Sequence, residues 1–98
     1  MRLWVDDIRP APNGYTTANT VNDAIHKILT AELLREVVEV IDIDHDAGVY
    51  VSDGGDYIKL LDWLEETGRN YPIHIHSMNP VGVENMRAII RRNGWREV

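Results

Sequence analysis

The sequence predicts an α/β domain with a mostly parallel sheet and about three helices. Three apolar runs have the length of strands, at residues 3–5, 37–44 and 71–77. Between and after these runs, apolar residues recur at helical spacing, at about residues 20–35, 57–68 and 83–94. Strands that alternate with helices are typical of a parallel sheet with right-handed crossovers. Since the chain has 98 residues, we expect one domain over residues 1–98.

The first half of the chain contains two strand candidates and one helix. The apolar run at 3–5 ends at two aspartates and a loop punctuated by Pro10, Pro12 and the pair Asn13-Gly14. Residues 15–18 predict a brief second strand, and we leave its pairing and direction open because the approach is too short for a helical crossover. Thr20 and Asp23 resemble a capping box, which predicts a helix from about residue 20 to the mid-30s.

The second half predicts two more strands and two more helices. The run at 37–44 is nearly continuous and β-branched, as is typical of a strand buried on both faces. A turn-rich stretch precedes a helix that starts at Tyr57 and ends near Gly68. The run at 71–77 predicts the next strand. A turn then leads into a helix that starts near Gly82 and closes at Asn93-Gly94, and residues 95–98 are a candidate for a short final strand.

The composition excludes several classes of protein. The chain is 44 % apolar and 27 % charged, which are ordinary values for a globular domain, and it has no cysteine for disulfides, thiolate metal sites or thiol nucleophiles. No apolar run approaches the roughly 20 residues of a membrane span, and acid follows the first residues too soon for a signal peptide. We therefore expect a cytoplasmic protein with no membrane partner. The net charge of −6 argues against extended nucleic-acid binding.

Side chains that can bind metal ions or take part in catalysis follow all three of the apolar strands. The strands are followed by three polar sets, namely Asp6-Asp7, Asp44-His45-Asp46 and His76-Ser77-Met78-Asn79. Ligands of parallel α/β sheets bind outside the carboxyl ends of the strands, so we expect these residues to converge on one edge. Three separate strand ends that agree are harder to obtain by chance than a single motif.

The aspartates at this edge predict a cation site. Two negative charges about 4 Å apart repel by about 4 kcal/mol at an effective dielectric near 20, so such a cluster needs raised pKa values or a bound cation. We expect Asp6, Asp7 and Asp44 to be the ligands of a divalent metal. Oxygen donors favour Mg²⁺ or Mn²⁺, and a nearby imidazole also admits zinc or iron.

Structural interpretations compete with these functional ones. Asp42 is interpreted as a solvent-exposed residue at a strand edge, and His74 as a hydrogen-bonded core histidine on the same face as His76. Ser77 and Asn79 are also candidates for capping the helix that follows them. The arginines near the C-terminus fit a solvated helix face better than a phosphate site.

The polar residues resemble the receiver domain of response regulators. An acidic pair after strand one, Asp44 after the central strand and Ser77 after a later strand follow the receiver pattern. This resemblance implies a three-layer receiver-like (flavodoxin-like) fold, shortened here, in which the pair holds magnesium, Asp44 accepts phosphate and Ser77 contacts the phosphoryl group. The chain departs from receivers because they carry a lysine after the fifth strand, whereas its last lysine is Lys59.

A narrower resemblance is to the cyclic-phosphate-processing receiver-like family of bacteria and phages. It rests on three motifs, at residues 6–10 (Asp-Asp-Ile-Arg-Pro), 43–48 (Ile-Asp-His-Asp-Ala-Gly) and 75–80 (Ile-His-Ser-Met-Asn-Pro). The resemblance spans about residues 2–90, and it implies processing of cyclic phosphate ends during RNA repair. Ala47, where the family usually has Leu, and the loop at 49–54 depart from its pattern.

The sequence thus predicts a metal-dependent phosphoesterase that acts on a cyclic phosphate, such as a 2′,3′-cyclic RNA end or a small nucleotide. Imidazole titrates near neutral pH, so His45 and His76 are candidates for general base and general acid, and Asp46 joins them as a catalytic candidate. We expect three residues to hold phosphate oxygens, namely Arg9, Ser77 and Asn79. Two alternatives stay open: a non-enzymatic receiver-like switch that binds metal and phosphate, and an interaction protein whose acidic loop 42–56 engages a basic surface.

Overall fold

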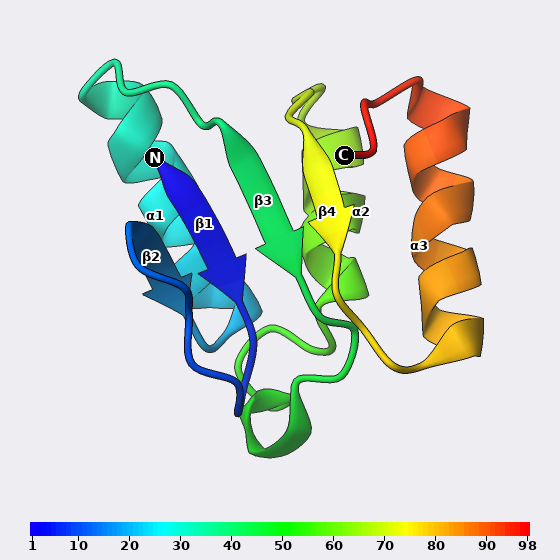
Figure 1. The fold of residues 1–98 in the computed structure, drawn as a ribbon. Helices are drawn as coiled ribbons and strands as arrows, with labels where there is room; N and C mark the ends of the chain where they lie inside the picture. Colours follow the sequence, from blue (N-terminus) through cyan, green and yellow to red (C-terminus); the bar gives the residue numbers. More distant parts are fainter.

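A computed structural model describes all 98 residues as a four-stranded parallel sheet with three α-helices (Figure 1). The strands are β1 (Arg2–Val5), β2 (Tyr15–Ala18), β3 (Val40–Ile43) and β4 (Ile73–Ile75). The helices are α1 (Val21–Leu33), α2 (Ile58–Glu66) and α3 (Pro80–Asn93), with a short 3-10 helix η1 (Gly48–Tyr50). The predicted α/β receiver-like class is confirmed.

The strand order is β2-β1-β3-β4, so the first strand lies inside the sheet. Val5, the last residue of β1, is in register with Ala18 on one side and Ile43 on the other. The second strand therefore exists, and it pairs parallel to β1 although no helix connects the two. The loop at residues 6–14 returns the chain to the start of β2, and it carries the acidic pair at the carboxyl edge.

Helices α1 and α2 pack on the same side of the sheet and leave the other side uncovered, which makes two layers rather than the expected three (Figure 1). The crossovers from β2 to β3 and from β3 to β4 advance in the same direction, so right-handed connections place α1 and α2 on the same face. Helix α3 lies beyond β4 and packs against α2. The opposite face has no helix, and Arg2 and His74 are exposed on it.

The core fills the space between the sheet and the helices. It consists of 20 buried residues, among them Leu3, Val5, Ile41, Ile43 and Tyr57. None of the helices has the length and apolar character that crossing a membrane requires.

Local signals at the ends of the helices act as the sequence predicted. The Thr20 side chain accepts a hydrogen bond from the Asp23 N–H at the start of α1. Helix α3 is capped by Asn79 and ends at Gly94 in the left-handed conformation. Three strand predictions were too long: β3 begins only at Val40, β4 spans only Ile73–Ile75, and the C-terminal residues contribute a single parallel bridge at Glu97.

Candidate functional site

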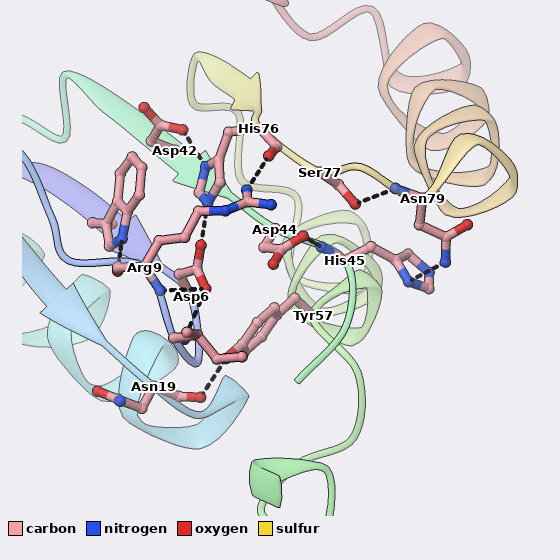
Figure 2. Close-up of polar contacts among 12 residues, drawn as sticks. Asp6, Arg9, Asn19, Asp42, Asp44, His45, Tyr57, His76, Ser77 and Asn79 are labelled. Atoms are coloured by element: carbon pink, nitrogen blue, oxygen red, sulfur yellow. Dashed lines mark hydrogen bonds and ion pairs between the residues drawn. The ribbon is translucent and has the colours of Figure 1, made fainter. Parts of the chain in front are cut away.

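The carboxyl ends of β1, β3 and β4 bring Asp6, Asp44 and His76 together (Figure 2). Each of these residues directly follows the last residue of its strand. One ligand atom from each lies within 4.8 Å of the others, which is a distance that a single cation can span. The convergence expected from the strand ends is therefore present for these three residues.

His76 is held between two carboxylates. Its Nε2 lies 2.8 Å from Oδ2 of Asp6, and its Nδ1 lies 2.6 Å from Oδ1 of Asp42. The indole of Trp4 stacks on the imidazole with the ring centroids 4.0 Å apart and the planes 5° from parallel. Since the side chain is only 11 % exposed, these contacts fix both the position and the rotation of the ring.

The solvent exposure of two polar residues of the sheet differs from the prediction. Asp42 is 8 % exposed rather than solvated, because His76 and Trp4 cover it on the open face. His74 is exposed rather than part of the core, because no helix lies over its face of the sheet. Its Nδ1 still makes a hydrogen-bond contact of 2.7 Å with the Val98 carbonyl oxygen.

Asp6 combines burial with several hydrogen bonds. Its Oδ1 accepts from the backbone N–H of Ile8 at 3.0 Å and of Arg9 at 3.2 Å, which closes a tight turn after β1. Burial alone would raise the pKa of Asp6, but the hydrogen bonds from Ile8, His76 and Arg9 hold it below its usual value. The carboxylate is thus kept ionised and fixed in direction.

Asp7 lies beside this group in a less favourable environment. Burial, its contact with Asp6 and the charges of Asp6 and Asp44 together raise the pKa of Asp7. Its Oδ2 fits against Gly48, where an ideal Cβ would lie only 2.4 Å away, and Gly48 has a φ of +56°. The predicted ligand set was Asp6, Asp7 and Asp44, whereas the closest group of donors contains His76 in place of Asp7.

Tyr57 lies close enough to the three aspartates for their charges to act on it, and no sequence pattern predicted this. The side chain is fully buried, and its hydroxyl donates a hydrogen bond of 2.6 Å to the carbonyl oxygen of Asn19. Burial and the charges of Asp7, Asp6 and Asp44 raise its pKa strongly. An apolar stripe on a helix marks such a tyrosine only as a core residue.

The Arg9 side chain lies beside the acidic group (Figure 2). Its Nη1 donates a hydrogen bond of 2.7 Å to the backbone oxygen of His76. The indole N–H of Trp4 donates a hydrogen bond of 2.9 Å to the backbone oxygen of Arg9. Trp4, which connects Arg9 and His76, was not among the predicted site residues, because nothing in a strand pattern distinguishes it from an ordinary apolar residue.

A second polar group surrounds His45 at the start of α3 (Figure 2). His45 Nδ1 lies 2.9 Å from Oδ1 of Asp46, and the Asn79 amide nitrogen is 3.5 Å from both. The ring packs against Gly82, where an ideal Cβ would lie 2.4 Å from its Cγ. Figure 2 shows the imidazole turned toward Asn79 and away from His76. The two predicted catalytic histidines therefore belong to different groups.

Asp44 belongs to the acidic group and is adjacent in sequence to His45, which belongs to the second polar group. Its Oδ1 accepts a hydrogen bond of 2.7 Å from the N–H of His45. Ser77 and Asn79 have the capping roles that we weighed for them: Ser77 Oγ accepts from the Asn79 N–H, and Asn79 Oδ1 accepts from the Gly82 N–H.

The donors at the carboxyl edge fit a divalent cation. Three carboxylates crowd together there, and burial, followed by the contact with Asp6 and the charges of Asp6 and Asp44, raises the pKa of Asp7. Carboxylate oxygens suit Mg²⁺ or Mn²⁺, while the imidazole of His76 also admits zinc or iron. The donor set therefore accepts a divalent metal without fixing which one.

A parallel sheet with an acidic group beyond its carboxyl ends defines a receiver-like domain. The family model described as the cyclic-phosphate processing receiver domain matches residues 1–92, and the chain belongs to that family. No curated protein and no solved structure matches the chain.

Proposed function

We propose that the protein is a metal-dependent phosphoesterase that opens a cyclic phosphate, with a 2′,3′-cyclic RNA end or nucleotide as the substrate. The observation that carries the proposal is the group of Asp6, Asp44 and His76, with Arg9 beside it. Membership in a cyclic-phosphate processing family supports the choice of substrate.

The cation in this proposal is Mg²⁺ or Mn²⁺, held by Asp6 and Asp44 with Asp7 close by. When bound, it would supply charge neutralisation for the phosphoryl oxygens and orientation for the attacking water. The fixed turn of Asp6 favours this role, because a carboxylate already held in place loses little freedom on binding.

Arg9 is the group best placed to bind a phosphate oxygen. Its guanidinium is exposed apart from the single hydrogen bond to the His76 backbone, so further N–H donors remain for an anion. In the proposal, Ser77 and Asn79 also bind phosphate oxygens, although the side chain of each already makes a hydrogen bond within the protein.

The two histidines take different parts in the proposed reaction. Both ring nitrogens of His76 contact carboxylate oxygens. This residue therefore orients the acidic group, and neither nitrogen is available to exchange a proton with the substrate. In His45, Nδ1 contacts the Asp46 carboxylate, whereas Nε2 has no contact of this kind. The Asp46 contact orients the ring, as a carboxylate commonly does for a catalytic imidazole. We therefore assign proton transfer at Nε2 to His45.

An assay of the purified protein with 2′,3′-cyclic nucleotides tests the proposal. The reaction is run with Mg²⁺, Mn²⁺ or Zn²⁺, and the product is measured as a nucleoside monophosphate. We expect His45→Ala to reduce kcat by at least about 100-fold, consistent with the usual contribution of a proton-transfer group, and Asp44→Asn to reduce kcat through the loss of a metal ligand. The control variant His26→Ala alters an exposed histidine on α1 and should keep full activity. No turnover with any metal would overturn the proposal.

The non-enzymatic switch makes a different prediction for the same aspartate. Incubation with a small phosphodonor would increase the mass of the protein, and Asp44→Asn would abolish the increase. The structure argues against this outcome, because the two lysines bond elsewhere: Lys27 to Thr17 and Asp23, and Lys59 to Asp62. No lysine therefore stabilises a phosphoryl group on Asp44.

A further inference from the structure

Four large aliphatic side chains are exposed in the segments that carry the acidic site. Ile8 is 84 % exposed, Val49 86 %, Met78 83 % and Val81 71 %. We call these four residues the apolar rim. They come from four segments at the carboxyl edge: the loop after β1, η1, the loop after β4 and the first turn of α3.

Each rim residue is tied to the site through an adjacent contact. The N–H of Ile8 donates to Oδ1 of Asp6, and Val49 follows the glycine against which Asp7 packs. Met78 lies between Ser77 and Asn79, and the Ser77 hydroxyl accepts a hydrogen bond from the Asn79 N–H across it. Val81 precedes the glycine that supports the His45 ring. The backbone at or next to each rim residue is therefore held by a contact with the polar groups.

A phosphate and a cation do not need aliphatic neighbours. Apolar side chains grouped around a polar site are typical of pockets that bind a ligand with both a charged and an apolar part. The pocket of the protein, about 320 Å³ and lined by Met1, His26 and Thr30 among others, is open to solvent and lies away from the acidic edge. The apolar part of a ligand at this edge must therefore contact the open rim.

We infer that the apolar rim binds the terminal nucleoside of the substrate and gives the site its preference for nucleotides. This inference rests on the proposed function and names the feature of the substrate that the site selects. The faces of a base pack well against aliphatic chains and against a polarisable methionine sulfur. The chain has a net charge of −6, which disfavours a long polyanion and favours a single terminal nucleoside.

The experiment compares two substrates that share the reacting ring. Adenosine 2′,3′-cyclic phosphate carries a base and a ribose, whereas ethylene glycol cyclic phosphate has only the five-membered cyclic phosphate. The variant combines Ile8→Thr, Val49→Thr and Met78→Gln, which remove apolar character with little change in size. The control is Leu33→Gln on α1, since Leu33 is 82 % exposed but far from the site in the chain.

We expect the triple variant to lose about tenfold in kcat/KM on the cyclic nucleotide, in line with losing apolar contacts from a few side chains. The value for ethylene glycol cyclic phosphate should not change, and Leu33→Gln should change neither. Equal losses on both substrates, or no loss on the nucleotide, would overturn the inference. A wild-type dimer that the triple variant converts to a monomer would also overturn it, because a second copy would then cover the rim.

A binding measurement separates failure of this inference from failure of the proposed function. If neither compound is turned over with any metal, the phosphoesterase proposal fails while the rim stays testable by calorimetry. We expect adenosine 3′-phosphate to bind at least tenfold more tightly than inorganic phosphate, and the triple variant to remove this difference. Equal affinities for the two ligands in the wild-type protein would refute the rim as a nucleoside site.

Discussion

Trp4 illustrates how one side chain can link residues that lie far apart in the chain. Its ring stacks on His76, its N–H bonds to Arg9, and its edge meets Tyr15 with the centroids 6.0 Å apart. It lies on the sheet face that no helix covers, where polar side chains would otherwise meet water. Trp4 therefore supplies on this face part of the packing that a helix would provide.

Replacing Trp4 with Phe tests the indole hydrogen bond separately from the stack. We expect Trp4→Phe to lower the free energy of unfolding by about 1 kcal/mol, since the Arg9 carbonyl loses its donor while a ring remains over His76. Trp4→Leu should cost about a further 1 kcal/mol, because the stacked ring is also lost. Urea denaturation monitored by far-UV circular dichroism measures both. Equal costs for Phe and Leu would contradict a contribution from stacking.

Gly48 and Gly68 form a matched pair of left-handed glycines. Both have positive φ, +56° and +68°, but a Cβ on Gly48 would meet Asp7 at 2.4 Å, whereas a Cβ on Gly68 meets nothing within 4 Å. We expect Gly68→Ala to cost about 1–2 kcal/mol from backbone strain alone. Gly48→Ala should cost about 2–4 kcal/mol, because the Asp7 side chain must also move. Equal losses in urea denaturation would show that Asp7 is not held against Gly48.

At the scale of elements, the strongest sequence signals were those of helices and their ends. The capping pair at Thr20 and Asp23 and the glycine at position 94 act locally, so the printed residues were enough to predict them. The pairing of β2 was not predictable in this way, because a strand of four residues carries no mark of its neighbour. The absence of a third layer depends on the direction of two crossovers across the sheet, which only the strand order reveals.

Helices α2 and α3 are joined at their ends by Glu65. Its carboxylate accepts two hydrogen bonds of 2.8 Å from the Arg92 guanidinium and one from the Asn93 amide. These hydrogen bonds, those from Arg92 above all, lower the pKa of Glu65 to about 2. The contact joins elements whose apolar faces already pack against each other.

The lowered pKa of Glu65 has a definite consequence for stability at low pH. Its folded pKa lies below the unfolded value of 4.5, so the contribution is present above pH 4.5 and is lost as the pH falls toward about 2. We expect Glu65→Gln to be less stable than wild type at pH 7 and equal to it near pH 2. The neighbouring Glu66→Gln, at an exposed position, is the control and should behave as wild type throughout. Melting curves across this range measure the difference, and a constant gap at every pH would contradict the assignment.

Across the whole molecule, the candidate site is a product of topology. Parallel strands direct all their carboxyl ends to one edge, so the convergence of Asp6, Asp44 and His76 follows from recognising three strands. The pairing of His76 with Asp42 does not follow, because it needs the register of β3 against β4 and an open face above them. For the same reason, the sequence does not indicate that the side chain of His45, although adjacent to Asp44 in the chain, lies in a different polar group.

The acidic edge also makes the metal-free protein less stable than it could be. The folded pKa of Asp7 is raised above its unfolded value of 3.8, so its ionised form opposes folding at neutral pH. Removing that charge should therefore stabilise the protein when no cation is present. We expect Asp7→Asn to raise the melting temperature at pH 7 in the presence of a chelator, as measured by differential scanning calorimetry. A lower melting temperature than wild type would show that Asp7 contributes more through contacts than it costs through repulsion.

A bound cation should stabilise the wild-type protein by removing the same repulsion. At 100 times its Kd, a ligand of the folded state contributes about 2.7 kcal/mol, and each kcal/mol raises the Tm of a domain of this size by about 4–8 °C. We expect Mg²⁺ or Mn²⁺ to raise the Tm of wild type, and Asp44→Asn to abolish the increase. Asp62→Asn removes an equal charge at a surface pair with Lys59, and it should keep the full increase. If no divalent metal changes the Tm, the crowded carboxylates bind no cation, and the catalytic and switch hypotheses both fail.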